Sequence, residues 1–372
     1  MKPRTTPLFL SILFSALCVL CSDSLGEAAR QNPNAAAAGI HVLPVSGNIY
    51  MIVGGGANIT ASVGRDGVLL VDTGSAQMSD KVLDMVRQLA AAVAAPVPAT
   101  PCVGLRCGEF SSPYGWSSPA INAIIGSPAP PKPIRYIINT TIDPDHTGGN
   151  AKIAAAGTTF TGGNIAATNP DAGSGAAIIA HENALTRMME AAGNPAAAPP
   201  PGLPNETYYL PSYKLSQFFN GEGIQIFHQP KARTDGDSIV YFRFSDVISA
   251  GDILSTTSYP IIDLKRGGSI QGVIDGLNHI LDIAIPEFRS QGGTLVIPGH
   301  GRLCDTGDVA NYRNMVAIIR DRVQSMITEG KTLEQIKAAK PARDYDGRYG
   351  SNKNWTPDMF IEAVYRSLNQ KQ

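Results

Sequence analysis

The sequence predicts an α+β protein in which two β-sheets pack face to face with helices on both outer sides, a four-layer αββα sandwich. Three observations lead to this prediction. The chain has 372 residues, 43% of them hydrophobic and 16% charged, enough for a large core. Short apolar runs separated by turn residues come in two groups. Each group is followed by segments with apolar residues at helical spacing, and layers with one apolar face are buried most simply against each other.

The first group of strands begins at His41. Residues 41–55 and 58–74 alternate apolar and turn residues, with Asp66-Gly67 between two apolar runs. Residues 77–95 carry apolar side chains at helical spacing, and residues 135–139 form a short buried strand. Between these two lies a stretch rich in Pro, Ser and Gly, residues 96–133, which is predicted to be a surface insertion.

The second half repeats the alternation. We expect a helix over residues 174–192, a Pro/Ala loop over 194–204 and strands over 224–227, 238–244 and 247–250. A helix over 270–285, a strand over 294–297 and a long amphipathic helix over 309–329 follow. The main domain then covers residues 40–330, and shorter helices at 332–339 and 357–368 make residues 331–372 a C-terminal helical extension.

The N-terminus predicts export. Lys2 and Arg4 precede a short apolar run over residues 7–20, so residues 1–26 are interpreted as a signal peptide, and a secreted or periplasmic protein is expected. No other stretch approaches the length of a membrane span, so the mature form is expected without a membrane. The formal net charge of -1 gives no electrostatic case for nucleic acid.

The cysteines agree with export. In an oxidising compartment, Cys102 and Cys107 can form a disulfide that staples the insertion 96–133. Two free thiols or a metal pair are the alternatives, although no second pair completes a zinc site. Cys304 is expected to be a small buried residue.

Ligand-type residues recur where predicted strands end. They are Asp72 in LLVDTG, the stretch TTIDPDHTGGN over residues 140–150, ARTDGD over 232–237, Asp252 in ISAGDIL and His300 in LVIPGHG. Loops at strand ends can gather such residues around one site. Asp and His at this density suit a hard-to-borderline metal ion. Asp72 itself is interpreted as a carboxylate that stabilises a loop beside the ligands.

These motifs resemble the metallo-β-lactamase superfamily, whose αββα sandwich carries a His-x-His-x-Asp-His motif after a strand, a His before a Thr-Asp-Gly-Asp-like turn, a later Asp or Cys and a final Gly-His-Gly loop. The resemblance covers roughly residues 40–330. It implies that Asp145, His146, Asp252 and His300 are the ligands of the family's second metal.

The departures from the family fall on the first metal site. Thr141, Asp143 and Arg233 stand where the family has the three histidines that bind the first metal. A guanidinium keeps its proton and has no lone pair to offer a cation. We therefore predict a partly buried, bidentate Asp143–Arg233 ion pair in place of that metal.

What remains suits one metal ion. Two carboxylates and two imidazoles fit Zn²⁺, or Fe²⁺ or Mn²⁺ with added waters. The alternative is an empty pocket in which the two carboxylates hydrogen-bond to the two imidazoles. His181 lies near a predicted helix and is not expected among the ligands, the alternative being that it approaches the site beside them. His41, His228 and His279 are expected to be surface or core residues.

Two functions follow from these alternatives. The first is a single-metal hydrolase with Asp145 and Arg233 as catalytic residues, Arg233 stabilising an oxyanion. The second is a non-catalytic protein that binds a small-molecule ligand in the old active-site cleft. A β-lactam substrate is not supported, because ILSTTSYP follows Asp252 where such enzymes often place a Lys.

Overall fold

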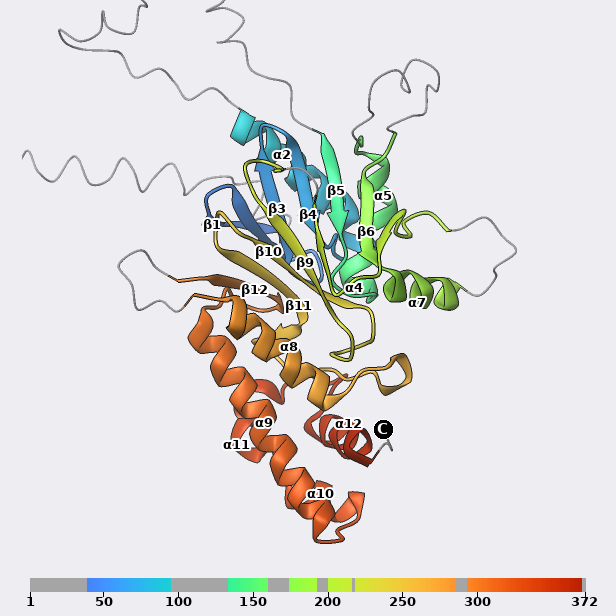
Figure 1. The fold of residues 1–372 in the computed structure, drawn as a ribbon, viewed down its shortest axis with the longest axis vertical. Coiled ribbons are helices and arrows are strands. Elements are labelled where there is room, and N and C mark those ends of the chain that lie inside the picture. Colours follow the sequence, from blue (N-terminus) through green and yellow to red (C-terminus); the bar gives the residue numbers. More distant parts are fainter. Residues whose placement is uncertain are drawn as a thin grey trace, which may run out of the picture.

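The computed structural model describes residues 39–94, 133–159, 174–192, 200–215, 218–285 and 293–369. Two β-sheets lie face to face in the middle of the molecule, and helices cover both outer sides (Figure 1). The predicted four-layer αββα sandwich is confirmed.

The first sheet has the strand order β1-β2-β3-β4-β5-β6-β7. Its strands are β1 (His41–Ser46), β2 (Ile49–Val53), β3 (Ile59–Gly64), β4 (Gly67–Val71), β5 (Ile134–Ile138), β6 (Ala177–His181) and β7 (Glu206–Tyr208). Tight turns make β1 to β4 antiparallel, whereas β4 to β7 are parallel and joined by longer crossovers. Because parallel strands end at the same edge, the segments after β4, β5 and β6 meet there.

The second sheet has the order β12-β11-β10-β9-β8. It contains β8 (Ser212–Lys214), β9 (Ile224–Gln229), β10 (Asp237–Phe242), β11 (Val247–Ser255) and β12 (Leu295–His300). Only the β11–β12 pair is parallel among the pairs described in this sheet. Asp252 near the end of β11 and His300 at the end of β12 therefore reach the same edge.

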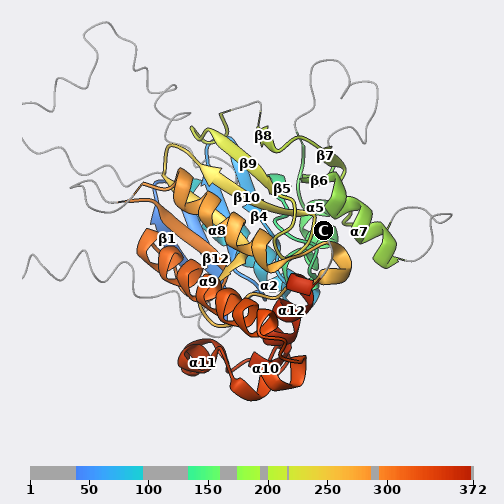
Figure 2. The same ribbon diagram turned by 60° about the horizontal axis from the view of Figure 1, so that its bottom comes forward.

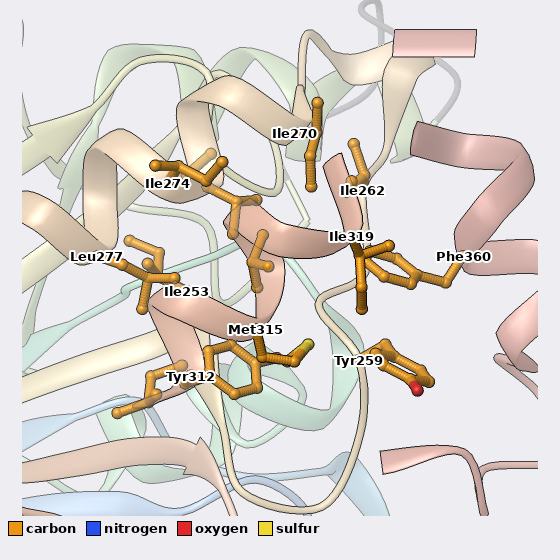
Figure 3. Close-up of a cluster of buried hydrophobic side chains, with 14 of the residues drawn as sticks. Ile253, Tyr259, Ile262, Ile270, Ile274, Leu277, Tyr312, Met315, Ile319 and Phe360 are labelled. Atoms are coloured by element: carbon orange, nitrogen blue, oxygen red, sulfur yellow. The ribbon is translucent and has the colours of Figure 1, made fainter. Parts of the chain in front are cut away.

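Three buried clusters hold the layers together. The one between the sheets joins Leu69 and Ile138 of the first sheet to Ile226, Val240 and Phe242 of the second. The first sheet's outer face packs on α2 (Ser79–Ala94) and α5 (Asn150–Ala155). The second sheet's outer face packs on α8 (Ile270–Ile283) and α9 (Thr306–Thr328), as Figures 2 and 3 show.

The remaining helices are short. Two 3₁₀ turns, η1 (Ala76–Met78) and η3 (Leu264–Arg266), and the helix α4 (Pro144–Thr147) lie in connections between larger elements, and α7 (Glu182–Ala192) follows β6. At the C-terminal end come α10 (Leu333–Ala339), α11 (Arg343–Tyr349) and α12 (Pro357–Asn369). These last three share one apolar cluster with α8 and α9, so the predicted extension packs directly on the second sheet's helix layer.

The helix predicted over residues 174–192 is wrong in its first half. Residues Ala177–His181 form the parallel strand β6, and the helix α7 begins only at Glu182. All five strand residues are buried, with β5 on one side and β7 on the other. A short apolar run buried on both faces has no alternation, and sequence periodicity does not separate it from a buried helix.

Some predictions lie outside the described residues. They are the signal peptide over residues 1–26, nearly all of the insertion 96–133, and the Cys102–Cys107 disulfide. Within the part of the chain that is described, Cys304 is a buried free thiol, as expected. No helix in that part is both long enough and apolar enough to cross a bilayer.

Candidate metal centre

The ligand-type residues predicted from sequence converge at the shared edge of the two sheets. Asp145 and His146 lie in α4, just after β5. Each of Asp145, His146 and His300 offers one potential ligand atom, and these three atoms lie within 4.8 Å of one another. Asp252 approaches from the opposite sheet, with its Oδ1 atom 3.1 Å from Nε2 of His146 and 3.4 Å from Nε2 of His300. The structure thus brings all four predicted ligands together.

Close backbone approach makes this convergence possible. Gly299 precedes His300, and a Cβ at this position would clash with Oδ1 of Asp252. The side-chain amide of Asn58 donates to the carbonyl oxygens of Pro298 and Gly301, which flank Gly299 and His300, at 2.9 and 3.0 Å. Asn58 belongs to the first sheet's β2–β3 connection, so its side chain ties the His300 loop across the sandwich.

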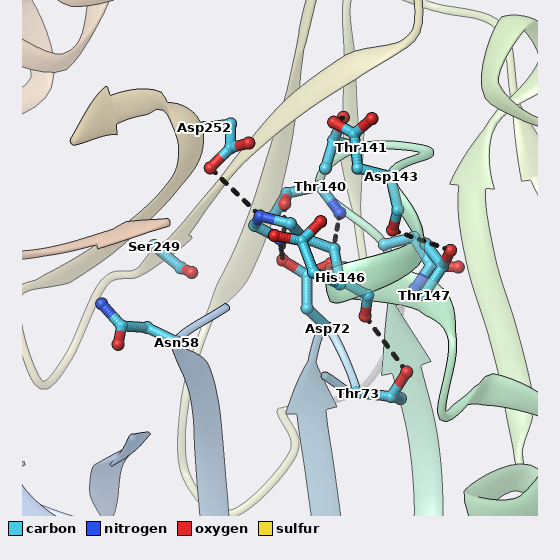
Figure 4. A network of polar contacts seen from close by, with 12 residues as sticks. Asn58, Asp72, Thr73, Thr140, Thr141, Asp143, His146, Thr147, Ser249 and Asp252 are labelled. Atoms are coloured by element: carbon cyan, nitrogen blue, oxygen red, sulfur yellow. Dashed lines mark hydrogen bonds and ion pairs between the residues drawn. The ribbon is translucent and has the colours of Figure 1, made fainter. Parts of the chain in front are cut away.

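Asp72 fixes the His146 ring. The Asp72 backbone lies in the left-handed region, with φ of 64°, and its carboxylate accepts hydrogen bonds from the Thr140 amide and hydroxyl at 2.9 and 2.6 Å. Oδ2 of Asp72 also lies 2.7 Å from Nδ1 of His146 (Figure 4). A neutral ring that donates from Nδ1 keeps a lone pair on Nε2, which faces Asp252. Asp72 therefore has the supporting position that its sequence context predicted.

Two buried atoms at the centre, Nε2 of His146 and Oδ1 of Asp252, face each other at 3.1 Å, an ion-pair distance when His146 is protonated (Figure 4). Among the described residues, neither atom has a hydrogen-bond partner with good geometry. Buried polar atoms are normally satisfied, and in the deprotonated state of His146 these two converging lone-pair atoms are suited to a shared cation. Together with Asp145 and His300, they could hold a metal ion.

The electrostatics point the same way. Burial alone lowers the pKa of His146, but Asp252 and Asp72 outweigh it and raise that pKa well above its usual value. The His300 ring, 3.1 Å from the Asp145 carboxylate, lowers the pKa of Asp145. Burial raises the pKa of Asp252, yet His146 and Arg233 more than reverse this and leave it lowered. These carboxylates are held in the charged form that binds a cation, and a proton and a metal compete for His146.

Arg233 lies between two carboxylates at the edge of the centre. Its Nε atom lies 2.5 Å from Oδ2 of Asp143, and its Nη1 donates to Oδ2 of Asp252 at 2.7 Å. The predicted contact with Asp143 is present, but the predicted bidentate geometry is wrong. The guanidinium uses different edges for two carboxylates, because Asp252 reaches it from the opposite sheet. Thr141 completes the group, and its hydroxyl donates to Asp143 at 3.3 Å.

Asp252 is consequently shared between a cation and the histidines. Arg233 neutralises Oδ2 of Asp252. Burial by itself lowers the pKa of Arg233, but the negative charges of Asp252 and Asp143 outweigh burial, and the pKa is raised. Oδ1 remains directed at the two imidazoles. A small pocket of about 20 Å³ lies beside this group. It is lined by Arg233, Asp252, His300, Ser255 and residues 258–261. A pocket of this volume has room for about one or two waters.

The other histidines are not part of the centre. His181 is buried and stacks on His228, with ring centroids 3.5 Å apart and an interplanar angle of 8°. The amide of Asn183 donates to Nδ1 of His181, and Nε2 of His228 lies 2.7 Å from the Asp235 carbonyl oxygen. His279 contacts Gln229 on the other side of β9. No sequence spacing predicts the His181–His228 stack, since the two residues come from strands of different sheets.

Comparison with known proteins agrees with this fold. A family model described as the metallo-beta-lactamase superfamily matches residues 43–300. The stereoselective inverting sec-alkylsulfatase Pisa1 from Pseudomonas sp. superposes with a TM-score of 0.57 at 15% identity, over 89% of this chain and 51% of that chain. A metallo-beta-lactamase from Pontibacter korlensis gives a TM-score of 0.45 at 10% identity, over 75% of this chain and 99% of that chain. The chain spans about half the length of the alkylsulfatase. No curated protein matches its sequence.

Removing the Arg233 charge is expected to destabilise the protein strongly. In Arg233→Met, Asp143 and Asp252 remain buried without their cation, which costs on the order of 3–5 kcal/mol. Urea unfolding with a chelator present measures the loss. The matched control is Arg187→Met, because Arg187 pairs with Asp235 at the surface, where about 0–1 kcal/mol is expected. Equal losses in the two variants would contradict the buried bridge.

The His181–His228 stack is expected to make stability depend on pH. Burial, together with His228, lowers the pKa of His181 in the folded protein to about 4. As the pH falls, the unfolded chain therefore binds a proton at this residue near pH 6.5, before the folded chain does. This contribution is complete above pH 6.5 and is lost as the pH falls towards 4. Urea unfolding at pH 7 and pH 5 measures the slope.

The variant His181→Phe keeps an aromatic ring against His228 and removes the titrating group. We expect it to lose less stability between pH 7 and pH 5 than the unmodified protein does. His41→Ala, at an exposed position in β1, is the control and should show the unmodified slope. An unchanged slope in His181→Phe would show that the stack does not titrate in this range.

Proposed function

Because the chain belongs to the metallo-beta-lactamase superfamily, we propose that it is a hydrolase-like protein with at most one metal ion. In this proposal Asp145, His146, Asp252 and His300 hold the ion, and the Asp143–Arg233 pair replaces the other metal of the family. The observation that carries the proposal is the pair of buried, unpartnered atoms, Nε2 of His146 and Oδ1 of Asp252.

The donor set suits Zn²⁺, and Fe²⁺ or Mn²⁺ with additional waters. When bound, such an ion supplies Lewis-acid polarisation of a substrate oxygen and lowers the pKa of water. The protein's own groups would do the rest. Asp72 keeps Nε2 of His146 facing the centre. Arg233 keeps positive charge beside Asp252, where it can stabilise developing negative charge on a substrate. In this proposal Asp145, which is partly exposed, would accept a proton.

A non-catalytic ligand-binding protein is the second candidate. Two observations favour it: Arg233 already neutralises one oxygen of Asp252, and the pocket beside it has room for about one or two waters. The alkylsulfatase and the β-lactamases share the fold at identities too low to carry their substrates over to this chain. The proposed substrate or ligand is therefore a small molecule whose reacting group is compact.

Export belongs to the proposal as well. The basic N-terminus and the apolar run over residues 7–20 support a Sec-type signal, which would place the mature protein outside the cytoplasm. In that compartment the Cys102–Cys107 pair would be oxidised.

The proposed centre is tested by titrating the purified, chelator-treated protein with Zn²⁺ and measuring heat and bound metal. One ion per chain is expected. His146→Ala should lose that binding, because Nε2 is one of the two unpartnered atoms. His279→Ala, which removes a histidine that contacts Gln229 and Phe227, should keep it. Failure of the unmodified protein to bind Zn²⁺ would sink the single-metal hydrolase and favour the non-catalytic alternative.

Restoring the family's first site is expected to raise the metal content. The triple variant Thr141→His, Asp143→His and Arg233→His supplies three neutral imidazoles where a guanidinium and a carboxylate now pair. Elemental analysis should then give two Zn²⁺ per chain instead of one. Circular dichroism in the presence of Zn²⁺ checks that the variant folds. A folded variant that still holds a single ion would contradict the assignment of these three positions.

A further inference from the structure

The wall of the pocket beside the centre is the loop that follows β11. Ser255 and Ser258 of this loop line the pocket together with Arg233, Asp252 and His300. The two serine hydroxyls lie 3.2 Å apart, and Oγ of Ser255 accepts from the Thr257 amide at 3.3 Å. The position of residues 255–261 therefore sets how much space remains beside Asp252 and His300.

Hydrogen bonds to the C-terminal helices hold this loop. The hydroxyl of Tyr259 shares its one proton between the carbonyl oxygen of Ala342, at 3.1 Å, and Oδ1 of Asp346 in α11, at 2.8 Å. Further along the loop, Nε1 of Trp355 donates to the Pro260 carbonyl oxygen at 3.1 Å. All three bonds reach residues beyond position 340.

Packing reinforces these hydrogen bonds. Tyr259 is fully buried, and its ring stacks on Phe360 of α12, with centroids 4.8 Å apart and an interplanar angle of 7°. Tyr349 of α11 lies against the same ring at 5.9 Å. Figure 3 shows Tyr259 and Phe360 side by side within the apolar cluster that also contains Ile262 and Ile319. A loop residue of the site is thus part of the core formed by the C-terminal helices.

We infer that the C-terminal helices α11 and α12 determine what can enter the site from this side, with Tyr259 and Trp355 as the positioning residues. These helices lie beyond residue 300, where the match to the family model ends. The inference rests on the proposed function in one respect only, namely that the pocket is part of a metal site. By holding residues 258–261 against Arg233, Asp252 and His300, the helices narrow the space that remains beside these three side chains.

A cysteine reporter in the pocket wall tests this inference. In Ser258→Cys, the reaction rate of the new thiol is measured by mass spectrometry of its peptide. The two reagents are the small methyl methanethiosulfonate and the bulky 5,5′-dithiobis(2-nitrobenzoate). The described native thiol, Cys304, is buried and lies on a different peptide. The small reagent is expected to react much faster than the bulky one.

The same reporter is then placed in Tyr259→Phe and Trp355→Phe backgrounds, singly and together. Tyr259→Phe keeps the ring stack and removes two hydrogen bonds, and Trp355→Phe removes the bond to Pro260. The ratio of small-reagent to bulky-reagent rates should fall in each single variant and fall about tenfold in the double variant. The reason is that the hydrogen bonds that hold a buried loop are lost. Tyr241→Phe is the control, because its hydroxyl bonds Asp246 at the far end of β11.

A ratio that stays unchanged in the double variant, or falls equally in Tyr241→Phe, overturns the inference. Near-ultraviolet circular dichroism reports whether each variant folds, and the single Tyr259→Phe variant decides the question if the double variant does not. Labelling needs no metal. A protein that fails to bind Zn²⁺ but shows the expected loss of size selection would lose the proposed function and keep the role of the C-terminal helices.

Discussion

The Arg233 guanidinium joins the two halves of the sandwich at the edge where the site lies. It contacts Asp143, which follows the first sheet's β5, and Asp252, which belongs to the second sheet's β11. Both carboxylates are largely buried, so each depends on this cation for its charged state, and the cation depends on them. Here the Arg233 side chain supplies the positive charge and the link between the sheets. Its guanidinium has no lone pair, so it cannot coordinate a metal ion.

The rest of the centre follows from the charge that Arg233 leaves unbalanced. Asp72, Asp145 and Asp252 surround His146 and His300, and one guanidinium does not neutralise this set together with Asp143. The remaining negative charge raises the pKa of His146 and favours any cation that can reach its Nε2 atom. A proton and a divalent ion are therefore alternative occupants of the same place. This competition links metal binding to pH and separates the hydrolase from the non-catalytic candidate.

The periphery of the site is built by parts of the chain that a family motif does not describe. Residues 258–261 belong at once to the pocket wall and to the core of the C-terminal helices, through Tyr259 and Phe360. On the other side, the His181–His228 stack packs beside the turn that carries Asp235, two residues after Arg233. Access to the site is thus decided by packing against elements that lie far from the ligand motifs in sequence.

The sequence by itself determined the layers and the identity of the four ligand candidates. Turn residues between alternating apolar runs mark β1 to β4, and polar residues after apolar runs mark the edge where Asp145, Asp252 and His300 meet. It did not determine β6, because the fully buried AIIAH lacks alternation and reads equally well as helix. Nor did it determine that Arg233 bridges two carboxylates instead of binding one of them bidentately. The hydrogen bonds and packing that hold Tyr259 of the pocket wall against α11 and α12 were likewise not determined by the sequence. Those outcomes depend on the distance between two sheets and on the docking of distant helices, and local sequence patterns carry no information about either.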